Sequence, residues 1–234
     1  GMGVSVLGSQ YWGKNEPEPI KRITGVGLKF ALGAGLIFML MTRFFPGAVL
    51  GIFTNDAAVI AEGSKYLRIM CWTYIIFAVS NTLMYSLQSV GTAFIGMVMS
   101  LSTIVINMCL NYCLIYGNLG CPELGITGAA IATLTSRIVE LVIITGYVLI
   151  FDKKLRMRVA DLLSLDMTYL GDFSKAALPV MVSGALWGVA QGAQTVILGH
   201  MSATVIAASS IASIVFQIFV VVGSASASTA SVTM

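Results

Sequence analysis

Long apolar runs separated by short polar segments dominate the hydrophobic pattern of this chain. Crossing the hydrocarbon core of a bilayer takes about 20 predominantly apolar residues in a helix, and several runs reach that length. The run from residue 31 to residue 150 carries few charges. They are Arg43, Asp56, Glu62, Lys65, Arg68, Glu123, Arg137 and Glu140. The pattern therefore predicts an all-α, polytopic transmembrane helical bundle.

About six membrane spans are expected. We place them at residues 28–53, 66–90, 94–116, 126–151 and 173–198, with a last span that follows a turn at 200–204 and runs to Met234. The polar segment 11–22 reads as a loop, because it combines two prolines with mixed charges. Both ends of the chain fall inside predicted helices, so we expect a piece of a longer protein.

Three local features predict how these spans begin and connect. Residues 54–56 resemble a helix cap, and an interfacial turn is expected between this cap and the second span. The break at residues 89–92 is so short that spans two and three should form a tight antiparallel hairpin. Pro179 is expected in the first turns of the fifth span, where proline is tolerated.

Composition supports the membrane assignment. The chain is 57% hydrophobic and 10% charged, against roughly 45–50% and about 25% in soluble domains. Three of the four cysteines fall inside apolar runs, and the pair Cys109 and Cys113 has no His or carboxylate at ligand spacing, so we interpret the cysteines as apolar packing residues. No catalytic triad, phosphate-binding loop or zinc spacing is present, and the net charge of +3 is small. Neither an enzyme nor a nucleic-acid partner is expected.

The placement of basic residues predicts an orientation. Two Lys/Arg-rich segments, at residues 14–29 and 153–175, are separated by four spans and should lie on the same side. Basic loops favour the cytoplasmic side, so we assign both segments to the cytoplasm and the chain to the cell membrane. Leu155, Val159, Leu162 and Leu163 recur at helical spacing in the second segment, which predicts a helix on the membrane surface.

Polar side chains within spans are costly in lipid and need a partner or a function. Asn107 and Asn111 are four residues apart and share one face of the third span. Arg137 and Glu140, in the fourth span, are spaced for mutual pairing. With Thr133 they form our candidate cation-binding or coupling set. Structural hydrogen bonds between helices, and a structural ion pair, are the alternatives.

Other uncharged polar and aromatic groups are candidates for the lining of a substrate path. The candidates are Gln10, Gln88, Trp187, Gln191 and Gln194, with Tyr74 and Phe77 as further aromatic faces for a cation. For each of them a packing or lipid-facing role is the alternative. His200 is expected in a surface turn.

Five segments carry a family resemblance when they are taken in order. They are SQYWGK (9–14), NMCLNYCLIYG (107–117), ELGITGAAIATLTSR (123–137), ALP (177–179) and ILGHMSATVIAA (197–208). With them the chain resembles the multidrug and toxic compound extrusion (MATE) family of cation-coupled antiporters. The resemblance implies a twelve-helix protein in two six-helix lobes. Residues 1–151 would form part of the first lobe, 152–172 a cytoplasmic linker, and 173–234 the start of the second lobe.

The same resemblance implies particular site residues. The family's Na⁺ or H⁺ site uses a carboxylate on helix one, which lies outside this chain, together with positions that match Asn107 and Thr133. Its Asp position holds Asn111 here, which leaves the coupling ion open. Another branch of the family carries a glutamate where this sequence has Trp187, so that branch's site is not carried over. The only metal considered is a Na⁺ at Asn107, Asn111 and Thr133.

The expected function is secondary active transport: antiport of Na⁺ or H⁺ against organic cations, drugs or toxic metabolites. Membrane lipid, a small organic solute and the rest of the same transporter are the expected partners. One alternative is a lipid-linked sugar flippase of related fold, which usually needs a more basic central cavity than Arg137 provides. Another is a membrane fragment that transports nothing.

Overall fold

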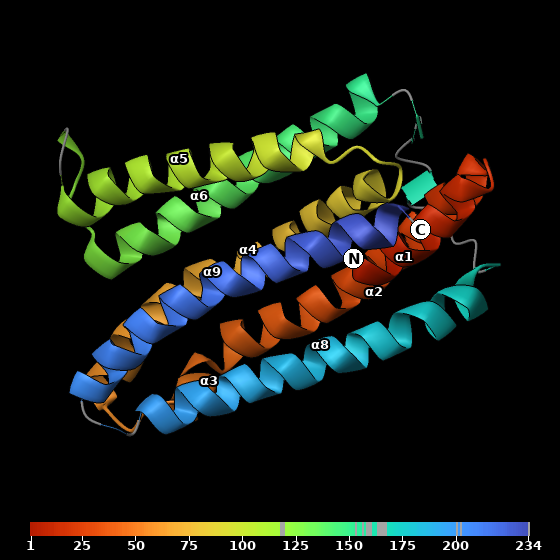
Figure 1. Ribbon diagram of the computed structural model, residues 1–234. Helices are drawn as coiled ribbons and strands as arrows, with labels where there is room; N and C mark the ends of the chain where they lie inside the picture. The colour runs from red at the N-terminus through yellow and green to blue at the C-terminus, as the bar shows by residue number, and fades with distance from the viewer. Residues whose placement is uncertain are drawn as a thin grey trace.

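The computed structural model describes residues 1–234 except 118–119, 153, 156, 158–160, 163–167, 200, 202 and 234. Regular structure in the described residues is entirely helical (Figure 1). The helices are α1 (Met2–Gly13), α2 (Pro17–Phe44), α3 (Pro46–Gly51), α4 (Ala57–Ser89), α5 (Phe94–Tyr116), α6 (Gly125–Gly146), the π-helix η2 (Tyr147–Phe151), α8 (Leu170–Gly199) and α9 (Ala203–Thr233).

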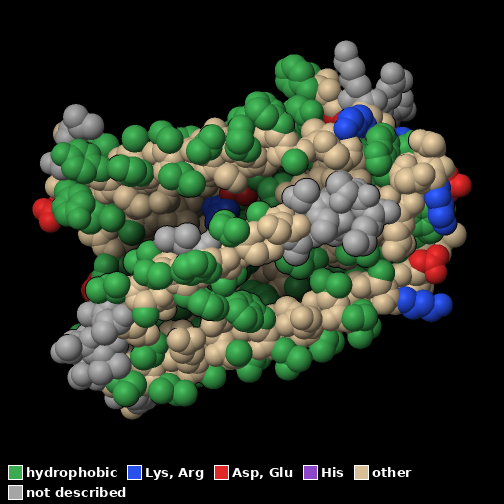
Figure 2. All heavy atoms as spheres, viewed as in Figure 1, with side chains coloured by type: hydrophobic (Ala, Val, Ile, Leu, Met, Phe, Trp, Pro, Cys, Tyr) green, Lys and Arg blue, Asp and Glu red, His purple; other side chains and the backbone are tan. Residues whose placement is uncertain are grey.

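Six of the described segments are long and apolar enough to cross a membrane. They are Pro17–Phe44, Ala57–Ser89, Phe94–Tyr116, Gly125–Phe151, Leu170–Leu198 and Ser209–Ser226. Large apolar side chains are exposed along most of these helices, and Figure 2 shows many hydrophobic side chains on the face that is in view. Such a surface suits lipid rather than water. The prediction of an all-α bundle with about six transmembrane spans is confirmed.

The polar segment 11–22 is more helical than its composition suggests. Helix α1 continues to Gly13 and α2 begins at Pro17, which leaves only residues 14–16 between them. A proline in the first helical position costs no hydrogen bond, because that N–H has no partner in a helix. The predicted loop and the start of span one at residue 28 are therefore wrong. At the other end, Pro46 separates α2 from the short α3.

Helix α4 begins where the predicted cap lies. The Asp56 carboxylate accepts hydrogen bonds from the backbone N–H groups of Ala58 (2.9 Å) and Val59 (3.5 Å). The cap satisfies donors that the first turn would otherwise leave unpaired. The interfacial turn expected after it is absent, because α4 is one continuous helix of 33 residues.

The tight hairpin expected between spans two and three does not form. Helices α4 and α5 share a hydrophobic cluster near their connection, where Leu87 packs with Ile95 and Met99. Beyond it, α5 runs along α6, and α6 runs along α4. A Cβ on Gly128 of α6 would clash with the carbonyl of Leu114 in α5. Small residues of this kind allow close helix approach in membranes, so the neighbour is chosen by packing and not by loop length.

Pro179 lies deeper in its helix than expected. Helix α8 begins at Leu170, so this proline is an interior residue with about two and a half turns before it. An interior proline removes one backbone hydrogen bond and favours a kink. The expectation that Pro179 belongs to the first turns is wrong, because the polar residues before Phe173 are already helical.

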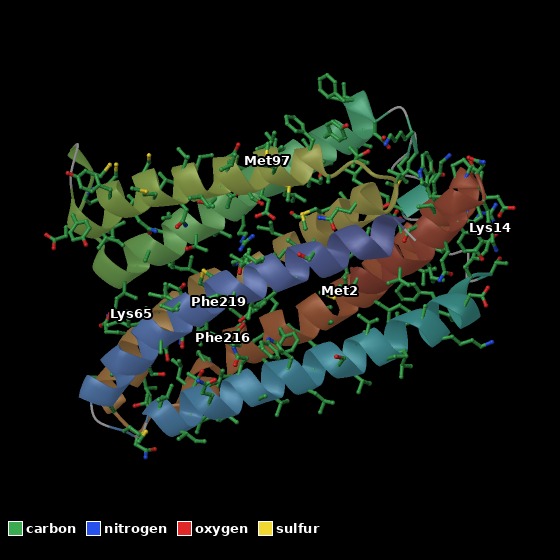
Figure 3. All side chains as sticks on the ribbon, viewed as in Figure 1. Met2, Lys14, Lys65, Met97, Phe216 and Phe219 are labelled. Atoms are coloured by element: carbon green, nitrogen blue, oxygen red, sulfur yellow. The ribbon has the colours of Figure 1, made fainter. Side chains whose placement is uncertain are left out.

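The buried core gathers at one end of the bundle, the end at which Lys14 lies in Figure 3. Part of segment 152–172 contributes to it: Leu155 and Met157 are buried in one cluster with Leu87 and Ile144. Lys154 beside them donates to the carbonyl of Val90 (2.7 Å). Leu155 therefore packs inside the protein, whereas Val159 and Leu163 of the predicted surface helix lie outside the described residues.

Helices α8 and α9 are held to the rest through the first half of α8. Phe173 and Ala177 pack with Val4 of α1 and Ile23 of α2 in a second buried cluster. Beyond Ala177 the described side chains of α8 and α9 are nearly all exposed. The α8–α9 pair thus joins the bundle at the Lys14 end and leaves its remaining length free of close packing.

Candidate functional site

Helices α5 and α6 bring the three predicted cation-site residues together. The Asn111 amide donates to Asn107 Oδ1 (2.9 Å), and the Asn107 amide donates to Thr133 Oγ1 across the helix interface (3.4 Å). The Thr133 hydroxyl in turn donates to the Ala129 carbonyl within its own helix (3.0 Å). All three side chains are half-buried. They form one chain of hydrogen bonds between two membrane spans.

One side-chain oxygen of these three residues is the exception in this series of hydrogen bonds. Asn111 Oδ1 is buried and has no hydrogen-bond partner among the described residues. An amide oxygen can accept two hydrogen bonds or coordinate a cation. A buried acceptor without a partner typically costs about 1–3 kcal/mol. The Asn107–Asn111–Thr133 group therefore has spare acceptor capacity but carries no charge of its own.

Arg137 and Glu140 form the predicted ion pair. Their Nη1 and Oε2 atoms are 2.6 Å apart, and the Glu140 side chain is only 7% exposed. The guanidinium also lies over the ring of Phe77 in α4, 5.0 Å from its centroid. A buried carboxylate of this kind needs its partner, because an unpaired charge in a membrane interior is strongly unfavourable. Phe77 thus contacts a cation as expected, but this cation is the guanidinium of Arg137.

The two groups share one side of α6. Thr133, Arg137 and Glu140 follow each other at spacings of four and three residues, which places them on the same helical face. Asn107 approaches this face from α5, and Phe77 approaches it from α4. Figure 2 shows a basic and an acidic side chain in the hollow between α6 and α9. Three helices therefore surround one polar stripe inside a largely apolar bundle.

Phe77 also forms part of the wall of an open pocket. Its volume is about 220 Å³, and it is lined from α2 by Phe38, from α4 by Tyr74, Phe77 and Asn81, and by Gly1 and smaller residues. Asn81 is half-buried and is an amide side chain in this otherwise mainly apolar lining. The sequence pattern had indicated Tyr74 and Phe77 but missed Phe38 and Asn81. The four-residue spacing of Asn81 from Phe77 was the available signal for its place on this face.

The five candidates for a substrate path are not brought together. Gln10 lies on α1 and Gln88 near the end of α4, whereas Trp187, Gln191 and Gln194 lie on the exposed second half of α8. None of them lines the pocket beside Phe77. They also do not line a second, almost wholly apolar pocket of about 320 Å³ between Phe30 of α2 and the residues around Phe173 and Met181 of α8.

The candidate residues provide amide, hydroxyl, carboxylate and guanidinium groups in the membrane interior. In the described part of the chain, no three His, Cys, Asp or Glu side chains are close enough to hold a metal ion. A Na⁺ at the Asn107–Asn111–Thr133 group would be held by neutral oxygens, with Asn111 Oδ1 as the ligand already free. Three neutral oxygens alone make a weak cation site.

Known proteins resemble this chain over much of its length. The family described as MatE matches residues 1–113. A probable multidrug resistance protein NorM from Listeria monocytogenes is 29% identical over 132 residues, which cover 56% of this chain and 29% of the relative. The probable multidrug resistance protein YoeA from Bacillus subtilis is 27% identical over 218 residues, covering 89% and 45%. The chain spans less than half the length of both relatives.

Solved structures show the same fold. An outward-facing multidrug resistance MATE family transporter of the MOP superfamily superposes with a TM-score of 0.70 at 21% identity, covering 81% of this chain and 41% of that one. A MOP superfamily transporter from Pyrococcus furiosus also gives 0.70, at 20% identity over the same shares. An inward-facing MATE family transporter gives 0.62 at 20% identity, covering 76% and 42%.

Proposed function

The chain belongs to the MATE family, and on this premise we propose that the protein exports small organic solutes across the cell membrane in exchange for Na⁺ or H⁺. The multidrug resistance names of NorM and YoeA support an exported drug or toxic metabolite. We further propose that residues 1–151 belong to a first lobe, 152–172 to a linker and 173–234 to a second lobe.

The polar stripe on α6 and its partner residues on α5 carry this proposal. A passive helical bundle would satisfy each intramembrane polar group, since an unpaired one is costly there. Here Asn111 Oδ1, next to Asn107 and Thr133, has no hydrogen-bond partner in the part of the chain that the structure describes. That oxygen supports a role for the group as half of a cation site, which gains its charge from a carboxylate elsewhere in the protein.

Proton coupling is the second mode that the geometry supports. Glu140 is the carboxylate on the α6 stripe, and it is held by Arg137. Protonation of Glu140 would release the guanidinium, which then keeps only its contact with the Phe77 ring. Since Phe77 also lines the 220 Å³ pocket, a change at the pair reaches the wall of that pocket. The residues provide a physical route between protonation and solute binding.

The aromatic lining of the pocket favours an organic cation as the solute. Phe38, Tyr74 and Phe77 present ring faces of the kind that attract cations. A bulky anionic substrate, as in a sugar flippase, would need free positive charge. Arg137 does not provide it, because Glu140 neutralises it at 2.6 Å. We therefore propose export of organic cations and not lipid flipping.

The test is dye export by cells that express the protein from its complete reading frame. Efflux of a fluorescent organic cation is followed while an imposed Na⁺ gradient or pH gradient is varied separately. We expect efflux to depend on one of these gradients. Substituting Asn107→Leu should reduce the dependence on that gradient at least several-fold, because it removes both the bond to Thr133 and the acceptor for Asn111.

Thr103→Val is the matched control. Thr103 lies one turn before Asn107 on α5, and its hydroxyl donates only to the Met99 carbonyl of the same helix (2.8 Å). This variant should export dye like the unmodified protein. If the protein is present in the membrane and efflux changes with neither the Na⁺ gradient nor the pH gradient, the proposed coupling is disproved.

A further inference from the structure

Helices α2 and α8 meet at the Lys14 end of the bundle and then leave a groove between them. Phe173 of α8 packs with Ile23 of α2 in a buried cluster, and its ring centroid lies 5.7 Å from that of Phe30. At this contact begins the open pocket of about 320 Å³, with Phe30 on one side and α8 from Phe173 to Ala185 on the other. Figure 1 shows α8 running beside α2 over this stretch. We call this pocket the α2–α8 groove.

The walls of the α2–α8 groove are apolar. Leu178, Met181 and Val182 line it with side chains that are half exposed or more. Ser174 is the one described lining residue with a polar side chain, and its hydroxyl already donates to the Leu170 carbonyl of the same helix (2.7 Å). A polar solute would lose its hydrogen bonds to water here without replacing them. The groove therefore fits a hydrocarbon chain.

The length of the groove matches one leaflet of a bilayer. Its lining on α8 extends over twelve residues, from Phe173 to Ala185. A helix that rises about 1.5 Å per residue covers about 18 Å over this stretch. Half of a hydrocarbon core of about 30 Å is about 15 Å. Since α8 begins at Leu170, at the Lys14 end (Figure 3), the groove reaches from that membrane surface to about the middle of the bilayer.

A lysine lies at the outer end of the groove. Lys175 is exposed and lies between Phe173 and Ala177 in the chain. It precedes Val182 by seven residues, or about two helical turns, so both side chains leave α8 in nearly the same direction. Asp172, by contrast, precedes Ser174 by two residues and leaves the helix on the opposite side. An ammonium group beside the outer end of an apolar groove favours a negatively charged lipid headgroup.

We propose that the α2–α8 groove binds an anionic phospholipid, with one acyl chain along Leu178, Met181 and Val182 and the phosphate beside the Lys175 ammonium. The site is separate from the pocket beside Phe77, and lipid binding here does not depend on solute export. The lysine argues for this occupant, because a further helix of the transporter or a second copy of the chain would need only the apolar walls.

The test is native mass spectrometry of the purified protein, expressed from its complete reading frame. The protein is equilibrated in mixed micelles with equal amounts of phosphatidylglycerol and phosphatidylcholine that carry the same acyl chains. Lipids that stay bound after the detergent is removed are identified by mass. We expect at least one bound phospholipid, with phosphatidylglycerol preferred about five-fold, which is the effect of one lysine near an anionic headgroup. No transport is measured, so the result is independent of the proposed export.

Two pairs of variants locate the site. Ala185→Trp fills the inner end of the groove and should remove one bound phospholipid. Ala190→Trp, five residues further and on the far side of α8, should keep it. Lys175→Gln should bring the preference for phosphatidylglycerol at this site close to unity while the acyl chain stays bound. Lys14→Gln removes a charge from the same end of the bundle but not from the groove, and should keep the preference.

Two results would overturn the proposal. In the first, Ala185→Trp retains all the lipids of the unmodified protein, which would mean that another part of the transporter or a second copy of the chain fills the groove. In the second, the unmodified protein binds the two phospholipids equally. Lys175→Gln changes only an exposed side chain, so it decides the headgroup contact even if Ala185→Trp does not fold.

Discussion

Two ion pairs of the same spacing lie in opposite surroundings. Lys65 and Glu62 are 2.7 Å apart with side chains 62% and 50% exposed. Arg137 and Glu140 are 2.6 Å apart with side chains 35% and 7% exposed. An exposed pair contributes about 0–1 kcal/mol, since water solvates both charges when they separate. A buried pair contributes little as a unit, but losing one partner leaves a charge without compensation.

Substituting Glu140→Gln should lower the thermal stability of the detergent-solubilised protein by about 3–5 kcal/mol, because Arg137 loses its counter-charge. It should also flatten the pH dependence of export, since the carboxylate is gone. Thermal unfolding followed by size-exclusion chromatography, and dye efflux at several pH values, measure the two effects.

Glu62→Gln is the control, with the same chemical change in the exposed pair. Its stability should stay within about 0.5 kcal/mol of the unmodified protein. If Glu140→Gln keeps its pH dependence at normal abundance, the pair is structural only and proton coupling through it is wrong.

Helix pairing in this bundle depends on where small residues lie. The α5–α6 contact needs Gly128, where a side chain would meet the Leu114 carbonyl, and Gly117 makes the turn that returns the chain to α5. Close backbone approach strengthens van der Waals packing between helices, which lipid does not otherwise favour. The same contact aligns Asn107 with Thr133.

Gly128→Ala tests whether the α5–α6 contact depends on a small residue at this position. We expect a loss of about 1–3 kcal/mol in stability, because α6 must move away from α5 to fit the methyl group. Gly146→Ala, on the same helix, is the control: nothing lies within 4 Å of its added Cβ. It should be neutral or slightly stabilising, because alanine favours a helix over glycine. If both variants lost the same amount of stability, the loss in Gly128→Ala would not come from the α5–α6 contact.

For the whole molecule, the two Lys/Arg-rich segments indicate which end of the bundle faces the cytoplasm. Lys14 and Lys65 lie at opposite ends in Figure 3. Lys154 lies at the Lys14 end, with its ammonium 5.8 Å from the centroid of the Trp12 ring. The two segments that the sequence assigned to one side also pack together, since Ile20 of the first and Leu155 of the second share a buried cluster. Positive charge is retained on the cytoplasmic side, so this end should face the cytoplasm.

A labelling experiment checks the orientation. Lys14→Cys and Lys65→Cys are made separately in a background in which the four native cysteines are serines. A membrane-impermeant maleimide should label Lys65→Cys on intact cells and Lys14→Cys only after permeabilisation. Labelling in the reverse order would place the basic end outside and refute the assignment.

The sequence by itself determined features that depend on neighbours along the chain. The span of α5 at residues 94–116, the Asp56 cap and the Arg137–Glu140 pair were all predicted correctly. Each follows from the helical repeat or from a side chain that bonds to its own backbone, so no distant residue is involved. The elements and half of the candidate site were therefore predictable.

Only the tertiary structure decided which helices lie side by side. It placed α5 against α6 instead of α4 and brought Phe77 onto Arg137. It also kept the glutamines of α1, α4 and α8 from forming one path. In a membrane every span has an apolar surface, so hydrophobicity does not select a partner. Close packing at a few small residues does, and those contacts join positions that are distant in the sequence.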